Sequence, residues 1–560
     1  MQESHPLEWS GSKTMQLTEW EIWYTYSTYL KSTVIDLEAA ARRLVDSGVA
    51  LCAVHRDGQA NWRSKTGTQS GQISVQISKS GSRGTIKVNP DQKDASYEEF
   101  VEQALFEAAH FRFNEMRLYG TDSLLPPPYI RMMVGQCNLA NTKEDVFIRC
   151  YPVIKLYESG VLTVELRIIS PDRAIEPSDF IEQYVNLFQT GFDLIEVPPA
   201  ISKIGTRAYH HTLRKWSIRG RRQLLSLGFS HDRVVEDLTT VEKSSDFNFR
   251  LAPLSREEGF TDNLTSFTQS LFGIVAFVIS NPRDAWRFLL LGQKQLIQLG
   301  NFWIGRPHIY LVRFQGQADS ASENEQIFRS VFGRILARHW TEDGAFGVRH
   351  VPPNSRRFED YAAYITVSAS LWVWSKRGLE QNRRWTDVNR AHLIYEPQAT
   401  MELLEYAYML HKRLFEEAVS HSTSSAVIQA RRELAFLDNR MNQVSHFLEV
   451  QELLRNGWTA MGIPELQAQI KESLEIRQSE TSSKETETAE RTRRLLVILF
   501  GLLAVPRIAV DVIGPLWDYL ELWRPTDKAL AQLFMIALAM AGVALITLLL
   551  LKIVGKKPRT

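Results

Sequence analysis

Apolar and polar residues alternate, or recur at helical spacing, in short segments over the first 395 residues. Residues 73–77 alternate, which predicts a strand. Val146–Leu156 and Val161–Ile169 flank a turn at Gly160 and predict a β-hairpin. Helical spacing predicts a helix that begins near residue 100, and its apolar face consists of Phe100, Ala104, Leu105, Ala108 and Phe111.

A second group of such segments follows residue 300. His308–Phe314 predicts a strand, residues 325–339 predict a helix, and a further strand is expected around Tyr364–Trp374. Strands mixed with helices are typical of α/β domains. We therefore expect an α/β cytoplasmic body of two subdomains, residues 1–245, a candidate ligand sensor, and residues 246–395.

Heptad-like spacing replaces this mixture after residue 395. A proline at 397 is tolerated in the first turn of a helix. Residues 427–448 alternate steps of 3 and 4 over three heptads, which predicts a coiled-coil seam, and the Ser/Thr-rich break at 421–425 favours an antiparallel helix pair. We expect a long helical, coiled-coil-like stalk over residues 396–493. Its first apolar seam consists of Leu403, Ala407, Leu410 and Leu414.

The end of the predicted stalk has no large apolar residue, since residues 478–494 read QSETSSKETETAERTRR. One interpretation is a flexible polar linker, because such a segment buries too little apolar surface to fold. The alternative is one continuous helix around a wet vestibule, in which acidic rings in an oligomer attract cations. The candidate vestibule residues are Glu485, Glu487 and Glu490.

Two long apolar runs follow, residues 495–517 and 529–553. Each is long enough to cross a bilayer, which takes about 20 mainly apolar residues. The second run has no charged residue between Leu533 and Leu551. Because the linking segment is too short for a domain, we expect residues 494–560 to form a two-helix transmembrane hairpin.

The charges beside these runs predict the orientation, because basic residues close to a span tend to stay in the cytoplasm. Arginines at 491, 493 and 494 precede the first run, and basic residues at 552, 556, 557 and 559 follow the second. The N-terminal residues lack the basic region and apolar run of a secretory signal. We expect a protein of the inner cell membrane with two spans and both termini in the cytoplasm.

Polar residues interrupt the first apolar run. Arg507 and Asp511 are spaced i, i+4, on one face of a helix. A charge at bilayer depth costs at least about 2.5 kcal/mol, so such residues usually face protein or water. The first helix is therefore the candidate pore-lining helix, and Pro506 and Gly514 are places where it can bend. Alternatively, the pair neutralises itself inside an oligomeric bundle. Conduction requires several copies, since one hairpin cannot enclose a path.

The composition excludes several classes of function. The chain has 560 residues and a formal net charge of +1, which argues against a bulk polyanion binder, and we expect no nucleic acid polymer as a partner. Its three cysteines, Cys52, Cys137 and Cys150, are widely spaced and suggest neither a disulfide framework nor a cysteine-rich zinc site. No nucleophile, phosphate loop or metal constellation stands out. We therefore expect no enzyme, no cofactor and no metal site.

A basic stretch inside the body is the candidate site for an anionic ligand. Residues 197–231 contain no acidic residue. Arginine, lysine and tryptophan together can hold phosphates and stack a base, as a small nucleotide signal would require. The alternative is a solvated basic helix paired to acids elsewhere. The candidate residues are Lys203, Arg207, Arg214, Lys215, Trp216, Arg219, Arg221 and Arg222.

The α/β body, the helices that lead straight into the first of two C-terminal spans, the short outer loop and the basic tail together resemble the CorA family of divalent-cation channels. The resemblance lies mainly in residues 396–560. It implies a homo-pentamer whose first transmembrane helix lines the pore and whose cytoplasmic domain controls opening.

One motif departs from this family. CorA magnesium transporters carry Gly-Met-Asn at the outer end of the first span, where this chain has Gly514 followed by Pro515 and Leu516. The missing asparagine carbonyl argues against magnesium selectivity. With its larger body, the chain is more similar to the CorA-like effectors found beside type III CRISPR systems, in which a nucleotide signal acts on the channel.

These patterns favour an oligomeric, CorA-like ion channel that is gated by its cytoplasmic domain, and the resemblance suggests a nucleotide-activated effector of antiviral defence. Two alternatives stay open. The first is a divalent-cation transporter, and the second is a non-conducting scaffold protein tethered to the membrane.

Overall fold

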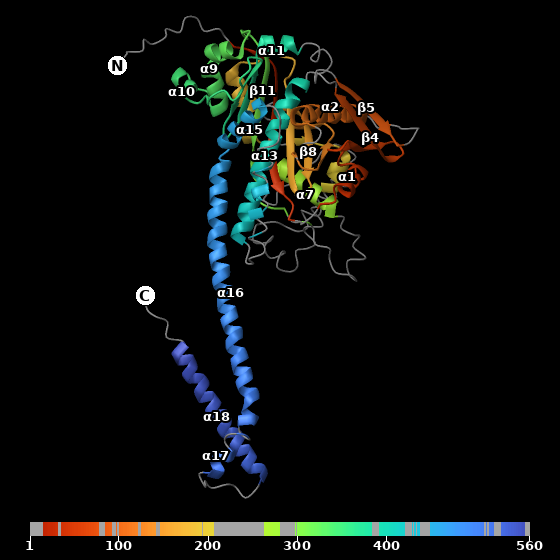
Figure 1. The fold of residues 1–560 in the computed structure, drawn as a ribbon. Coiled ribbons are helices and arrows are strands. Elements are labelled where there is room, and N and C mark those ends of the chain that lie inside the picture. The colour runs from red at the N-terminus through yellow and green to blue at the C-terminus, as the bar shows by residue number, and fades with distance from the viewer. Residues whose placement is uncertain are drawn as a thin grey trace, which may run out of the picture. The chain divides into compact units, whose positions relative to one another are not determined.

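The structure is a computed structural model. It describes residues 15–31, 35–77, 84–91, 97, 100–120, 125–141, 146–192, 194–205, 263–280, 297, 299–382, 391–420, 428, 431–432, 434–436, 439, 448–508, 511, 514–519 and 528–554. The described residues form a mixed α/β protein with a large sheet (Figure 1).

The strands of the described residues are β1 (Leu17–Tyr29), β2 (Cys52–His55), β3 (Gln59–Ser64), β4 (Gly67–Ile77), β5 (Gly84–Pro90), β6 (Tyr129–Met133), β7 (Cys137–Asn141), β8 (Val146–Tyr157), β9 (Val161–Ile169), β10 (Leu194–Glu196), β11 (Trp303–Phe314), β12 (Tyr361–Ile365) and β13 (Ser370–Trp374).

The helices of the described residues are α1 (Leu37–Asp46), α2 (Val101–Tyr119), α3 (Pro177–Phe180), η1 (Ile181–Val185), η2 (Leu187–Gln189), α7 (Leu264–Ser280), α9 (Ala321–Ala337), α10 (Gly344–Arg349), α11 (Lys376–Gln381), α13 (Ala391–Ser420), α15 (Leu448–Ala460), α16 (Ile463–Ile508), α17 (Gly514–Tyr519) and α18 (Lys528–Val554).

A 13-stranded mixed sheet organises the described part of the body. Its main path runs β12-β13-β11-β1-β9-β8-β6-β2-β3-β4-β5, with β7 and β10 attached beside β8. Only β11 and β13 pair in parallel among these strands, and the other pairs are antiparallel. The strand β1 lies inside the sheet, between β9 and β11, and therefore joins residues from both sides of the predicted subdomain boundary near residue 245.

The two faces of this sheet differ in chemistry, because successive side chains of a strand point to opposite faces. One face joins apolar residues such as Ile22, Val164 and Leu311 to the helices α1, α7 and α9 in one hydrophobic core. The other face is buried but rich in charge. It carries Glu21, Arg131, Lys155, Glu165, Arg167 and His308.

Several predicted elements are confirmed. The strands β8 and β9 pair as the predicted hairpin, β4 contains the alternating segment, and α9 covers most of the predicted helix at 325–339. The segment Tyr364–Trp374 is not one strand, because a turn at residues 366–369 separates β12 from β13. Phe100 was expected on the apolar face of α2, but it precedes the helix with φ of 64° and is 66% exposed.

The helix α13 departs from the predicted stalk. It begins before Pro397, at Ala391, and its predicted seam residues are buried. Its polar residues Gln398, Glu402 and Glu405 are buried too, because they contact the charged face of the sheet. Residues 391–417 therefore belong to the same compact unit as the sheet, which comprises residues 1–417 and 432–470. The seam at 427–448 lies mostly outside the described residues.

The second unit comprises residues 418–431 and 471–560. The helix α16 is unbroken from Ile463 to Ile508, which confirms a helix and not a flexible linker for the polar segment 478–494. The first predicted span is described only in part, because residues 509–510 and 512–513, between α16 and α17, lie outside the described residues. The helix α18 matches the second apolar run.

A search of the described residues finds no helix both long and apolar enough to cross a membrane. Several side chains of the two apolar runs, 546–550 among them, lie outside the described set. The membrane hairpin therefore stays a prediction of the sequence.

Candidate functional site

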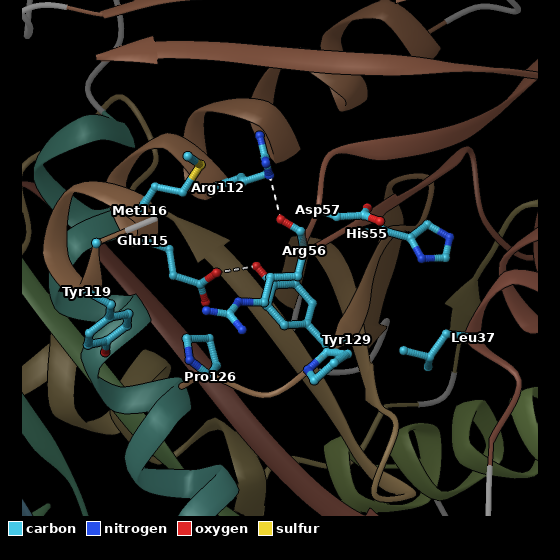
Figure 2. A pocket seen from close by; sticks show the side chains of 12 residues that line it. Leu37, His55, Arg56, Asp57, Arg112, Glu115, Met116, Tyr119, Pro126 and Tyr129 are labelled. Carbon is cyan, nitrogen blue, oxygen red and sulfur yellow. Dashed lines mark hydrogen bonds between the residues drawn. The ribbon is translucent and has the colours of Figure 1, made fainter. Parts of the chain in front are cut away.

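A cavity of about 460 Å³ lies beside the turn between β2 and β3, the helix α2 and the start of β6 (Figure 2). Apolar residues, among them Leu37, Met116 and Pro126, form part of its wall. The charged and polar part of the wall consists of His55, Arg56, Asp57, Arg112 and Glu115. The cavity therefore combines apolar surface with a few convergent polar groups, as small-molecule sites do.

The β2–β3 turn positions three of these residues. The strand β2 ends at His55, and the chain reverses at Asp57-Gly58. Gly58 has φ of 98°, and a Cβ atom there would lie 2.6 Å from the carbonyl oxygen of Ile73, so the turn requires glycine. The tight turn presents consecutive polar residues at the cavity.

Arg112 reaches the same turn from α2. Its Nε donates to the carbonyl oxygen of Arg56 at 2.8 Å, and its Nη1 donates to that of Ile73 at 3.4 Å. Only 9% of the residue is exposed, and burial lowers the pKa of Arg112. Within the described part of the chain, no carboxylate forms an ion pair with this guanidinium. Arg112 is thus a buried cation whose hydrogen-bond partners are neutral.

His55 is a second incompletely paired group at the cavity. It is 8% exposed, and its Nε2 has no hydrogen-bond partner among the described residues. Burial lowers the pKa of His55, although Asp57 acts in the opposite direction, so the imidazole is neutral near pH 7. A buried polar atom without a partner is costly and calls for an explanation.

Glu115 and Tyr129 connect the cavity wall to the charged face of the sheet. Glu115 accepts a hydrogen bond from the hydroxyl of Tyr129 and lies 3.1 Å from the Nζ of Lys155. The ammonium of Lys155 also lies 3.8 Å from the centre of the Tyr129 ring. Burial would lower the pKa of Lys155, but the carboxylates of Glu115 and Glu402 raise it.

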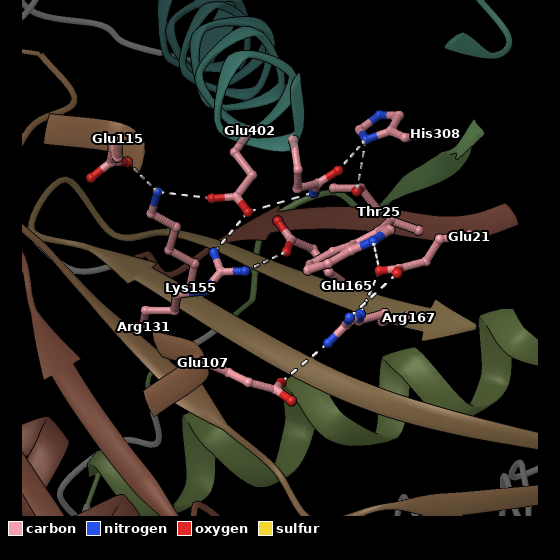
Figure 3. A network of polar contacts seen from close by, with 12 residues as sticks. Glu21, Thr25, Glu107, Glu115, Arg131, Lys155, Glu165, Arg167, His308 and Glu402 are labelled. Carbon is pink, nitrogen blue, oxygen red and sulfur yellow. Dashed lines mark hydrogen bonds and ion pairs between the residues drawn. The ribbon is translucent and has the colours of Figure 1, made fainter. Parts of the chain in front are cut away.

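Glu402 of α13 stands at the centre of this network (Figure 3). One carboxylate oxygen lies 2.7 Å from Arg131 Nη1, and the other lies 2.9 Å from Lys155 Nζ. Arg131 also lies 3.4 Å from Glu165 and 3.6 Å from the ring centre of Phe111. All four charged side chains are at most 3% exposed, so water screens these contacts little.

The two glutamates of the network differ in protonation. Burial raises the pKa of Glu165, and the charge of Glu402 raises it further. Burial acts in the same direction on Glu402, but Arg131 and Lys155 lower the pKa of Glu402 to about 2. Glu165 therefore holds a proton while Glu402 is ionised. Glu402 and Glu115 are the carboxylates that contact the two cations, Arg131 and Lys155.

Two further groups of charges flank this network on the same face. Arg167 pairs with Glu21 and lies 3.1 Å from Glu107. Arg306 lies 2.7 Å from Glu405 of α13. Most charged side chains of this face are therefore in ion pairs, and Glu402 and Glu405 connect α13 to the sheet. Within the described residues, no group of three or more His, Cys, Asp and Glu side chains is placed to hold a metal ion.

The predicted pore residues fall at the end of α16. Arg507 Nε lies 3.4 Å from Asp511 Oδ2, so the predicted i, i+4 pair forms. Pro506 lies inside α16, and Gly514 is the first residue of α17. The vestibule candidates Glu485, Glu487 and Glu490 all belong to α16, and the last two are exposed.

The basic stretch is described only in part. Lys203 lies in a helical segment, and its side chain is exposed. The other candidates, Arg207, Arg214, Lys215, Trp216, Arg219, Arg221 and Arg222, lie outside the described residues.

The sequence pattern does not reveal the cavity. His55, Arg56 and Asp57 are consecutive, but Arg112, Glu115 and Tyr129 are distant in sequence and meet only because β2 pairs with β6 and α2 packs on both strands. The one available signal was the Asp57-Gly58 turn, which predicts a hairpin with polar residues at its end.

The chain matches no protein-family model, no curated protein and no solved structure.

Proposed function

We propose that the protein is an oligomeric, CorA-like ion channel of the cell membrane, opened and closed by its α/β body. The observation that supports this most is the unbroken helix α16, which begins in the body's unit, continues through the polar segment 478–494 and ends inside the first apolar run. A continuous helix can transmit a movement of its first turns to the apolar run, whereas a flexible linker would absorb it.

The helical geometry indicates which of the acidic vestibule candidates can face a common axis. A helix turns by about 100° per residue, so positions 487 and 490 lie about 60° apart around the axis, whereas position 485 lies about 160° from 487. In an oligomer of parallel copies, Glu487 and Glu490 can therefore face one axis together, while position 485 lies on a nearly opposite side. We propose Glu487 and Glu490 as the acidic ring that attracts cations.

The pairing of Arg507 with Asp511 supports a pore-lining or bundle-facing position for the end of α16. The two charges cancel, which lowers the cost of placing either at bilayer depth. Gly514 stands at the outer end of the predicted span, without the asparagine of the magnesium transporters. We therefore propose a cation path that is not selective for magnesium.

Gating by a small nucleotide signal, and a part in antiviral defence, are the proposals that follow from the resemblance to the CorA-like effectors. The feature that supports a nucleotide is the basic stretch around residues 203–222, which contains no acidic residue. A homo-pentamer is the assembly that the same resemblance implies.

Ion flux from proteoliposomes tests the proposal. The full-length protein is reconstituted with potassium or magnesium inside, and leak is measured with and without nucleotide extracts of phage-infected cells. We expect the extract to trigger leak of both potassium and magnesium. A matched variant, Glu487→Gln with Glu490→Gln, should fold normally and leak cations more slowly.

Two outcomes would contradict the proposal. Constitutive flux of magnesium alone, stopped by magnesium on the body's side, would identify a transporter. If the protein is a monodisperse monomer and no ion flux is measured, the scaffold protein is favoured, because a single hairpin cannot conduct.

A further inference from the structure

The cavity beside the β2–β3 turn carries two polar groups that its own walls leave incompletely paired. The guanidinium of Arg112 is nine-tenths buried and, among the described residues, donates only to main-chain carbonyls. The Nε2 of His55 is buried and has no partner in the described part of the chain. Both residues line the same space of about 460 Å³.

The charge balance of this wall favours an anion over a cation. Arg56 and Arg112 contribute two positive charges. Of the two acidic residues, Glu115 is already satisfied by Lys155 and Tyr129, which leaves Asp57, a residue of the turn. A guanidinium forms its strongest hydrogen bonds with carboxylates and phosphates. Asp57 and Glu115 act on Arg112 from beyond ion-pair distance, so an anion in the cavity would give this guanidinium a direct acidic partner.

The rest of the wall is suited to an apolar body. Leu37, Met116, Pro126 and the ring of Tyr129 line the cavity together with the charged groups (Figure 2). The volume falls in the range of about 300–1,000 Å³ that small-molecule sites occupy. A bare inorganic ion would leave most of this surface exposed to water.

We infer that this cavity is a binding site for a small organic anion, with the acidic group held by Arg112, Arg56 and His55 and an aromatic or apolar body against Met116 and Pro126. The acidic group is a carboxylate or a phosphate. The residues of this site are different from those of the basic stretch near residues 203–222.

The position of the cavity also gives the ligand a route to α13. Glu115 and Tyr129 belong both to the cavity wall and to the buried network, and Lys155 links Glu115 to Glu402 of α13. A ligand that competes for these groups changes the contacts that hold α13 on the sheet. This regulatory consequence rests on the proposed channel function, whereas the binding site does not.

Isothermal titration of the full-length protein in detergent with phenyl phosphate tests the site. We expect saturable binding to the wild-type protein, and binding at least about tenfold weaker for phenol and for inorganic phosphate, because each lacks one half of the recognised chemistry. Benzoate distinguishes the two kinds of acid: tighter binding of benzoate identifies a carboxylate site, and tighter binding of phenyl phosphate identifies a phosphate site.

Matched variants locate the binding. Arg112→Gln should weaken phenyl phosphate at least about tenfold, while Arg349→Gln, a substitution at an exposed arginine of α10, should leave it unchanged. Met116→Trp at the half-buried wall fills the cavity and removes no charge, so it should abolish binding even if Arg112→Gln fails to fold.

The inference is overturned if neither phenyl phosphate nor benzoate binds the wild-type protein at millimolar concentration, or if Met116→Trp binds them as the wild type does. Because the titration needs no ion flux, silent proteoliposomes would count against the channel alone.

Discussion

Lys155 carries its positive charge in the middle of a sheet face, with 1% of its side chain exposed. Taking such a charge out of water costs several kcal/mol, and opposite charges offset this cost only when they lie close and form hydrogen bonds. Here two carboxylates lie at 3.1 and 2.9 Å and an aromatic ring faces the ammonium. Each partner is therefore worth much more than a partner on the surface.

The substitution Glu402→Gln should show how much these buried charge pairs stabilise the fold. The amide removes the negative charge that Arg131 and Lys155 share, and it leaves two buried cations opposite one carboxylate. We expect a loss of about 3–5 kcal/mol in the free energy of unfolding. Urea unfolding of the full-length protein in detergent, followed by tryptophan fluorescence, measures it.

The matched control is Glu38→Gln. Glu38 pairs with Arg42 at 2.7 Å, but both side chains are more than half exposed, so we expect a change below about 0.5 kcal/mol. Equal losses for the two variants would show that the buried network contributes no more than a surface pair.

Glu165→Gln should be tolerated, because the folded protein already holds Glu165 in its neutral form. The raised pKa means that the folded state keeps a proton that the unfolded chain, with a pKa of about 4.3, releases. The wild-type free energy of unfolding should therefore fall as pH rises above about 4.5. In Glu165→Gln this decline should become shallower, as unfolding measured between pH 5 and 8 would show. A decline of unchanged slope would contradict the assignment.

Glu402 changes the pH dependence of the free energy of unfolding in the opposite direction. Its pKa of about 2 means that its contribution is present above about pH 4.5 and is lost as pH falls toward 2. The acid side of the stability curve should therefore persist in Glu165→Gln.

Among the elements, α13 shows what periodicity can and cannot predict. The spacing of Leu403, Ala407, Leu410 and Leu414 correctly predicts a helix with one buried stripe. It does not reveal that Glu402 and Glu405 are buried as well. Burial of these two carboxylates is stabilised by cations that are far away in the sequence, namely Arg131, Lys155 and Arg306. A helix with polar residues on its other faces was therefore assigned to a stalk.

The internal strand β1 was not predicted, for a related reason. Its sequence, LTEWEIWYTYSTY, lacks a simple alternation of apolar and polar residues, because both faces of the strand are covered. The dense aromatic and β-branched residues were the available signal. Hairpins with a clear turn, such as β8–β9, needed no such context and were predicted correctly.

The helix α16 allows a direct test of transmission. Ala489 is exposed in the polar segment, and Ala489→Pro should break the helix there at a cost of about 3 kcal/mol. We expect proteoliposomes with this variant to lose extract-triggered leak, while the body unfolds at the same urea concentration as in the wild type. Ala489→Ser, which keeps the helix, should leak normally. Normal gating in Ala489→Pro would show that continuity of α16 is not needed.

At the scale of the whole molecule, the pair Arg507 and Asp511 allows a test of the proposed membrane insertion. Either single neutralisation leaves an unpaired charge, which costs at least about 2.5 kcal/mol at bilayer depth. Arg507→Gln and Asp511→Asn should therefore each reduce the carbonate-resistant membrane fraction, and the double variant should restore it. Equal membrane fractions in all variants would place the pair outside the bilayer.

The cavity could be recognised only in the folded structure. Its residues come from a turn, a helix and a distant strand. The sequence does not show that, among the described residues, Arg112 donates only to carbonyls and the Nε2 of His55 has no partner. The apolar runs, in contrast, are local features, and the sequence alone predicts them.

The two edges of β1 find their partner strands at different times during biosynthesis. Residues Glu21–Tyr29 can pair with β9 once the ribosome has passed Ile169, but the other edge of β1 must wait for β11, which begins at Trp303. At about 5–20 residues per second, the intervening stretch of roughly 130 residues takes on the order of ten seconds to synthesise. During that time a long, aromatic strand edge is open to pairing with other nascent chains. Cells that make this protein quickly should therefore depend on chaperones that bind this edge.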